Sequence, residues 1–137
     1  MWTSGEVLGP FSLSITRELL VRYAGASGDY NPIHYDDEYA HSLGIPGVIA
    51  HGMLVMGLAA RVIRETAPLG AHLEQYGVRF RAMVETGQIL QVWGSVSSVE
   101  LTGQDQRAIV DIRVTGSGDV LHVTGQARFV WPAFKRL

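Results

Sequence analysis

The stretch Met53-Leu-Val-Met-Gly-Leu-Ala-Ala-Arg-Val-Ile-Arg-Glu-Thr66 decides the fold of this chain. Nearly every position in its first turns is apolar, whichever side of a helix that position would occupy. A helix that is hydrophobic all round is normally buried all round. We therefore expect a central helix over residues 53–66 that the remaining elements must cover.

The covering elements come mainly from the second half of the chain. From Leu73 onward, apolar and polar residues alternate with the period of two that is typical of half-buried antiparallel strands. Strands are predicted at residues 73–84, 90–97, 108–115 and 121–129, with a short strand at residues 11–15. About five strands and one apolar helix combine most simply as an α+β fold, in which a curled antiparallel sheet wraps around the helix. A free edge of such a sheet can pair with another subunit.

Composition limits the classes of protein that this chain can belong to. With 137 residues, 47% of them hydrophobic, it is long enough for one core, and we expect one domain over residues 1–137. It has no cysteine, so thiol catalysis and cysteine-ligated metal are excluded. The net charge of −2 and the scattered basic residues argue against a nucleic-acid partner.

The N-terminal sequence and the lengths of the apolar runs argue against a secreted or membrane-spanning protein. Residues 1–10 lack the basic start and apolar run of a secretory signal, and no run of apolar residues is long enough to span a bilayer. We therefore expect a cytoplasmic protein.

A second stretch, Ser27-Gly-Asp-Tyr-Asn-Pro-Ile-His34, predicts chemistry. It follows a helix that Thr16 is expected to cap. Asn31 is a suitable helix cap and Pro32 a suitable first helical residue, so a helix is expected over residues 32–42. Asp29 in the preceding loop and His34 in the first turn can then converge. A carboxylate and a neutral imidazole that share one water are suited to general acid–base catalysis.

Two other interpretations of this region stay open. Asp29 and Asn31 can simply satisfy nearby amides in an Asx-type turn. Asp36, Asp37 and Glu38 lie close in sequence to His34 and His41, a composition that permits a metal site. We favour a solvated first turn in which these carboxylates complement the helix dipole, and we expect no metal.

Three segments together carry a resemblance to a known family. They are Tyr23-Ala-Gly-Ala-Ser-Gly-Asp-Tyr-Asn-Pro-Ile-His34, Ile49-Ala-His-Gly-Met53 and Val78-Arg-Phe80. The chain resembles the MaoC-like, or (R)-specific, enoyl-thioester hydratases and dehydratases of the hot-dog fold. Within that family it is most similar to the actinobacterial (3R)-hydroxyacyl-ACP dehydratase B subunit. The resemblance implies syn addition of water to a trans-2-enoyl thioester, or the reverse reaction, with no cofactor beyond the CoA or acyl-carrier-protein thioester.

The resemblance also implies roles for individual residues. Asp29 and His34 match the family's catalytic pair, although which of them acts as the base stays open. Asn31 matches an orienting residue, and the backbone N–H of Gly52 matches the donor to the thioester oxygen. Gly52 opens the apolar helix, where the first amides lack intrahelical acceptors, so the same role is expected on physical grounds. His51 is expected to shape this turn.

The substrate pocket is harder to predict. Where several family members have a small hydroxyl residue on the central helix, this chain has small apolar residues. Candidates to line an acyl pocket are Met53, Met56, Gly57 and Ala60, although the methionines are equally suited to filling the core. Arg79 and Arg81 are suited to contacting carrier phosphates, or to forming a solvated strand face.

The expected partners are a thioester substrate and a second hot-dog subunit, either in a homodimer or in a heterodimer with a related chain. An acyl-carrier protein is a further partner if it carries the substrate. Two alternative functions stay open. The first is a non-catalytic or partner-dependent subunit that binds acyl groups. The second is a hot-dog thioesterase, which the Asp-x-Asn-Pro-x-His spacing disfavours.

Overall fold

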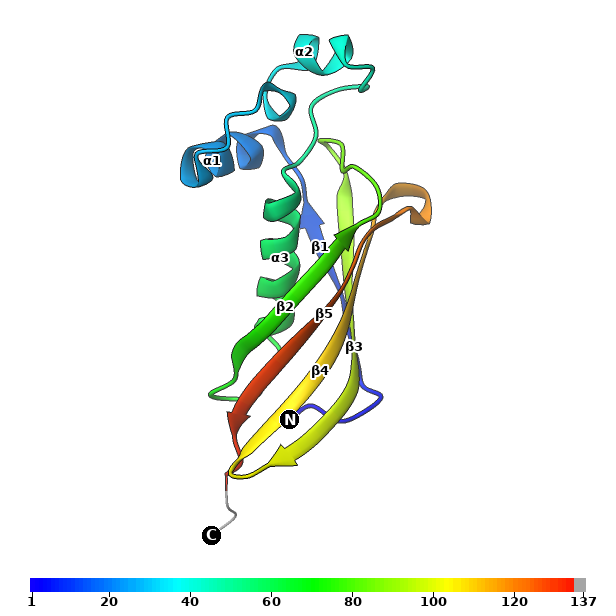
Figure 1. The fold of residues 1–137 in the computed structure, drawn as a ribbon. Helices are drawn as coiled ribbons and strands as arrows, with labels where there is room; N and C mark the ends of the chain where they lie inside the picture. Colours follow the sequence, from blue (N-terminus) through cyan, green and yellow to red (C-terminus); the bar gives the residue numbers. More distant parts are fainter. Residues whose placement is uncertain (135–137) are drawn as a thin grey trace.

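The computed structural model describes residues 1–134, which form one antiparallel sheet with helices on one side. The strands are β1 (Val7–Ser14), β2 (His72–Phe80), β3 (Ile89–Thr102), β4 (Asp105–Thr115) and β5 (Leu121–Pro132). Their order is β1-β3-β4-β5-β2, which leaves β1 and β2 at the two edges. Helix α3 (Gly52–Arg64) runs along one face of the sheet (Figure 1). The predicted curled antiparallel sheet around a central helix is confirmed.

The core lies between α3 and the strands. Leu54, Val55, Ala59, Val62 and Ile63 are the buried residues of α3. They pack in one cluster with apolar side chains from the alternating positions of the strands, among them Leu90, Val92, Val96, Val110, Ile112, Val114, Val123, Ala127 and Phe129. On β3 and β4 the intervening positions face outward, so the period of two predicted the buried face correctly there. At the start of β5 the prediction is wrong, because Leu121 is exposed and His122 is buried.

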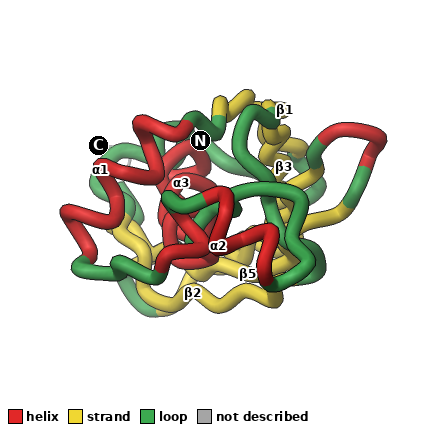
Figure 2. Tube along the Cα trace, turned by 90° about the horizontal axis from the view of Figure 1, so that it is seen from above, coloured by secondary structure: helices red, strands yellow, loops and turns green. Residues whose placement is uncertain are grey.

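The expectation that α3 is buried on every side is wrong. Met53 is 61% exposed, Gly57 is exposed, and Met56 and Ala60 are only half-buried. These four residues form what we call the α3 outer stripe. The sheet covers one face of the helix, whereas α1 (Arg17–Ser27) and α2 (Asp37–Ser42) gather at the end where α3 begins (Figures 1 and 2). Within residues 1–134, much of the opposite face therefore stays open.

Several element boundaries in the structure differ from the predicted ones. The helix expected over residues 32–42 is two elements, the 3-10 turn η1 (Pro32–His34) and α2, because Asp36 caps a new start by accepting from Tyr39 N. The strand expected over residues 73–84 ends at Phe80, where the backbone amides of Arg81 and Ala82 turn to the His122 oxygen. The short strand predicted at residues 11–15 begins earlier, at Val7. A further 3-10 turn, η2 (Ser117–Asp119), joins β4 to β5.

None of the helices within residues 1–134 combines the length and hydrophobicity that crossing a membrane requires. The longest, α3, has 13 residues.

Candidate active site

Local hydrogen bonds shape the corner between α1 and η1. Helix α1 begins at the predicted Thr16 cap, whose hydroxyl accepts from Leu19 N at 3.2 Å. After the helix, an Asp29 carboxylate oxygen (Oδ1) accepts from Asn31 N at 3.2 Å. The Asn31 side chain in turn accepts from Ile33 N at 3.2 Å and caps η1. The Asx-type turns and the helix cap are therefore both present, and they fix where Asp29 and His34 lie.

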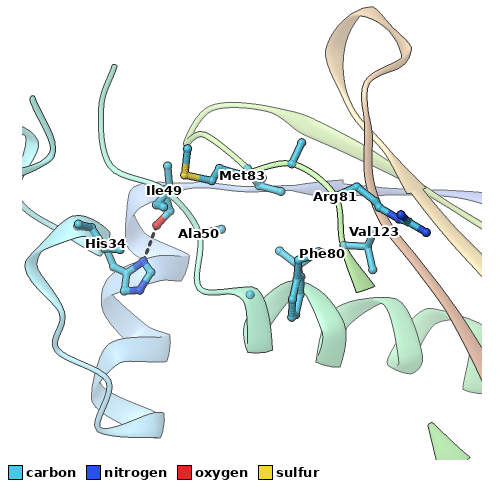
Figure 3. A pocket seen from close by; sticks show the side chains of 12 residues that line it. His34, Ile49, Ala50, Phe80, Arg81, Met83 and Val123 are labelled. Atoms are coloured by element: carbon cyan, nitrogen blue, oxygen red, sulfur yellow. Dashed lines mark hydrogen bonds between the residues drawn. The ribbon is translucent and has the colours of Figure 1, made fainter. Parts of the chain in front are cut away.

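His34 is buried and held from its inner side. The ring is 7% exposed, and its Nδ1 lies 2.7 Å from the Ile49 carbonyl oxygen (Figure 3). A carbonyl oxygen can only accept, so Nδ1 carries the proton. In the neutral ring, Nε2 is therefore left as an acceptor.

The carboxylate approaches the other ring nitrogen. Asp29 Oδ2 lies 3.7 Å from His34 Nε2, and the Asp29 side chain is 52% exposed. This separation is too long for a direct hydrogen bond, but one water can lie about 2.8 Å from both atoms. The predicted arrangement of a carboxylate and an imidazole around one water position is thus geometrically available, with one partner facing solvent and the other the interior.

Gly52 lies at the first position of α3, close to this pair. No hydrogen bond from its backbone N–H is found among residues 1–134, as expected for the first turn of a helix. The segment before it is anchored by Ile49 N to the Ile33 oxygen at 3.0 Å and by Ala50 N to the Val84 oxygen at 2.8 Å. A β-carbon at position 52 would lie 3.0 Å from the Phe80 ring, so the glycine allows that ring to approach the helix start.

His34 and Gly52 line the same cavity, whose volume is about 400 Å³. Figure 3 shows His34, Ile49 and Ala50 on one side of it and Phe80, Arg81 and Val123 on the other. The helix residues that line the cavity are Gly52 and Val55. None of the four pocket candidates predicted on α3 lines it, because the first residue of the helix and its inner face, not its outer stripe, point towards His34.

His51 is a neighbour that sequence reasoning placed only in the turn. Its ring is 2% exposed and stacks on the His34 ring, with centroids 3.7 Å apart and planes 21° from parallel. Burial lowers the pKa of His51 below its ordinary value of 6.5, and the nearby His34 acts in the same direction. The signal that pointed to this residue was its place directly before the apolar helix.

Three potential ligands lie together, namely Asp29, His34 and His51, with ligand atoms within 4.8 Å of one another. A metal ion would need ring lone pairs that converge at about 2.0–2.1 Å from each nitrogen. Stacked imidazoles direct their in-plane lone pairs along nearly parallel planes instead. The cluster is therefore better suited to holding a proton and a water than to holding a metal.

Asp37 in the acidic run has a structural role that differs from the predicted solvated one. It forms an ion pair with Arg17, and its other oxygen accepts from Val48 N at 3.1 Å. The hydrogen bond from Val48, together with Arg17, lowers the pKa of the Asp37 carboxyl from its ordinary value of 3.8. Through the bond from Val48, Asp37 thus anchors the segment that leads to Gly52, while Asp36 caps α2.

Arg81 is placed differently from Arg79. Arg81 lines the cavity and donates from Nε to the Thr124 hydroxyl at 3.1 Å. Arg79 lies outside that cavity, near the end of β2. Of the two predicted candidates for a carrier contact, only Arg81 is therefore adjacent to the site.

Comparison with known proteins identifies the family of this chain. A family model described as a MaoC-like domain matches residues 4–117. An (R)-specific enoyl-CoA hydratase from Rhodospirillum rubrum is 30% identical over 124 residues, which cover 88% of this chain and 82% of that protein. Other curated relatives are longer, and the chain spans 66% of one and 5% of another.

Solved structures give the same result. The R-hydratase PhaJ1 from Pseudomonas aeruginosa has a TM-score of 0.87 and 28% identity, with 99% of this chain and 88% of that chain covered. A chain of the ChsH1-ChsH2 complex from Mycobacterium tuberculosis shares the fold, with a TM-score of 0.84, 20% identity and coverage of 96% and 99%. The predicted hot-dog architecture is confirmed, and with the match over residues 4–117 the chain belongs to the MaoC-like family.

Proposed function

We propose that this protein is an (R)-specific enoyl-thioester hydratase, or a (3R)-hydroxyacyl-thioester dehydratase when the reaction runs in reverse. The observation that carries the proposal is the 3.7 Å gap between Asp29 Oδ2 and His34 Nε2, beside the cavity that Gly52 also lines. A carboxylate and an imidazole can supply the acid–base pair for water addition to an enoyl thioester, and an unpaired helix-start amide can supply the donor to the enolate oxygen.

In the proposed mechanism, a water occupies the gap between the two side chains. Asp29 accepts a hydrogen bond from one of its hydrogens, which stays on the oxygen, and His34 Nε2 removes the other as the oxygen bonds to Cβ. The electrons of the Cα=Cβ bond move onto the thioester carbonyl and give an enolate-like oxygen. The protonated His34 then returns its proton to Cα. Hydroxyl and hydrogen arrive from the same face, so the addition is syn.

The Gly52 N–H is proposed to hold the developing charge on the thioester oxygen. Removing one such donor costs about 100-fold or more in kcat in other enzymes. Asn31 acts in this scheme by capping η1, which fixes His34, and not by touching the substrate. The proposed scheme needs no metal or organic cofactor, because the thioester carbonyl is the electron sink.

We also propose that a second hot-dog subunit covers the α3 outer stripe. Within residues 1–134, strand β2 pairs only with β5, and the stripe on α3 leaves Met53 exposed. The fold is shared with a chain of the ChsH1-ChsH2 complex, in which related subunits associate. Pairing along β2 would place the stripe, with Met53 and Met56, against the partner subunit.

The test is incubation of the purified protein with crotonyl-CoA, longer enoyl-CoAs and the matching acyl-carrier-protein thioesters. Loss of the enoyl absorbance with formation of a 3-hydroxyacyl thioester supports the proposal. Release of free thiol would indicate a thioesterase instead. An inactive chain, alone and with related subunits, would contradict the proposal and favour a subunit that only binds acyl groups.

A further inference from the structure

We propose that His51 is a positioning residue that keeps His34 and Asp29 at the distance at which they share a water. The inference rests on the proposed function, since it concerns the same pair, but the contacts that carry it are independent of turnover. His51 reaches both members of the pair by different means, one through its ring face and one through a ring nitrogen.

The contact with His34 is a stack. With centroids 3.7 Å apart and planes at 21°, the His51 ring covers one face of the catalytic imidazole. Within residues 1–134, the hydrogen bond that orients the His34 ring is the one from Nδ1 to the Ile49 oxygen, and by itself it leaves some rotation about the Cβ–Cγ bond. A flat partner restricts this rotation, so Nε2 keeps pointing towards Asp29.

The contact with Asp29 is through its backbone. His51 Nε2 lies 3.2 Å from the Asp29 carbonyl oxygen, which can only accept. Nε2 therefore carries the proton, and the bond holds the loop that presents the Asp29 carboxylate. One rigid ring thus connects the loop before η1 with the imidazole inside η1.

The surroundings favour an uncharged His51. It faces His34 from η1, Asp29 from the preceding loop, and Tyr23 from α1, whose ring meets it edge-on at 4.8 Å. Its Nδ1 is buried and has no hydrogen-bond partner among residues 1–134. An unpaired buried acceptor is unfavourable, because its desolvation is not compensated. Packing alone would be served better by an apolar ring, so the role of an imidazole at this position is best explained by the Nε2 donor together with the flat face.

The experiment compares three substitutions. His51→Phe keeps a flat ring but loses the donor, His51→Gln keeps an N–H donor but loses the ring, and His51→Ala loses both. We expect His51→Ala to lower kcat about 10- to 100-fold with KM within about threefold of wild type, because small misplacements of catalytic groups have effects of this size. His51→Phe and His51→Gln should each recover part of the loss.

His122→Gln is the matched control. His122 is also buried, at 3% exposed, and it too has one backbone partner, the Ala82 oxygen, at 3.2 Å. The His122→Gln substitution should lower the melting temperature while leaving kcat nearly unchanged. A wild-type kcat in His51→Ala, a change in KM alone, or an equal kcat loss in His122→Gln would overturn the inference.

A spectroscopic measurement separates this inference from the proposed function. Two-bond proton–nitrogen correlation spectra of labelled protein report which His34 nitrogen carries the proton. Wild type should show the proton fixed on Nδ1, whereas His51→Ala should show averaging between the two nitrogens. Identical spectra would refute the positioning role even if the protein were inactive on every thioester, and an inactive wild type with the expected spectra would refute only the proposed reaction.

Discussion

The Asp29 side chain is 52% exposed to solvent, whereas the His34 side chain is 8% exposed. The exposed carboxylate can exchange water with bulk solvent, whereas the buried imidazole keeps its orientation. We expect Asp29→Asn and His34→Gln each to lower kcat by about 100-fold or more, since positioned acid–base groups contribute factors of this size.

Two exposed residues of the same types serve as controls. Asp119→Asn and His72→Gln remove the same chemistry at exposed residues that do not line the cavity. Initial rates of enoyl loss for the four variants check the prediction. Near-normal rates for either site variant, or comparable losses in the controls, would mean that the pair is not the catalytic centre.

Asp37 gives a pH prediction at the same scale. Because the pKa of its carboxyl is lowered in the folded protein, its stabilising effect is complete above the ordinary value of 3.8 and is lost as pH falls through and below that value. Asp37→Asn should therefore lower the melting temperature at pH 7, and the difference from wild type should shrink towards pH 3. A difference that is constant with pH would argue against the ion pair with Arg17 and the bond from Val48.

Between elements, the half-buried hydroxyl of Tyr76 connects the edge strand β2 to α3. Tyr76 donates to the Met56 carbonyl oxygen at 2.8 Å, and burial raises the pKa of Tyr76 to about 12. Tyr76→Phe should lower the free energy of unfolding by about 1 kcal/mol, the usual value of one such bond. Chemical denaturation measures this change, and unaltered stability would show that the bond contributes nothing.

The elements also show what the sequence can predict. Alternation on β3 and β4 and the Thr16 cap depend on neighbouring residues, so local patterns were sufficient. The break after His34 depends on competition between two caps, Asn31 and Asp36, which propensity alone does not resolve. The end of β2 depends on the distant His122 oxygen, and local periodicity carries no information about it.

The site, too, was predicted from the sequence only in part. The pairing of Asp29 with His34 follows from the Asn-Pro corner between them, and it was predicted from five residues of sequence separation. The stack of His51 on His34 joins two segments that are also connected by the bonds from Ile49 N to the Ile33 oxygen and from His34 Nδ1 to the Ile49 oxygen. The sequence of neither segment predicts that the two come into contact, so the stack became apparent only in the structure.

For the whole molecule, the exposed face of α3 leads to a prediction about assembly. Met53 on α3 and Val21 on α1 are similarly exposed, at 61% and 58%, but only Met53 belongs to the α3 outer stripe. Met53→Asp should disrupt association with another subunit, and Val21→Asp should not. Light scattering should show a wild-type mass of two or more 15.0 kDa chains, and a wild type that stays monomeric would require a related subunit in place of a second copy.

The most direct test of the proposed reaction is hydration of crotonyl-CoA in D₂O, followed by NMR of the product. A water held between Asp29 and His34 has access to one face of the double bond only. We predict a (3R)-hydroxy product with a single deuterium at C2, on the face that received the hydroxyl. A (3S) product, or deuterium distributed over both faces at C2, would contradict the account.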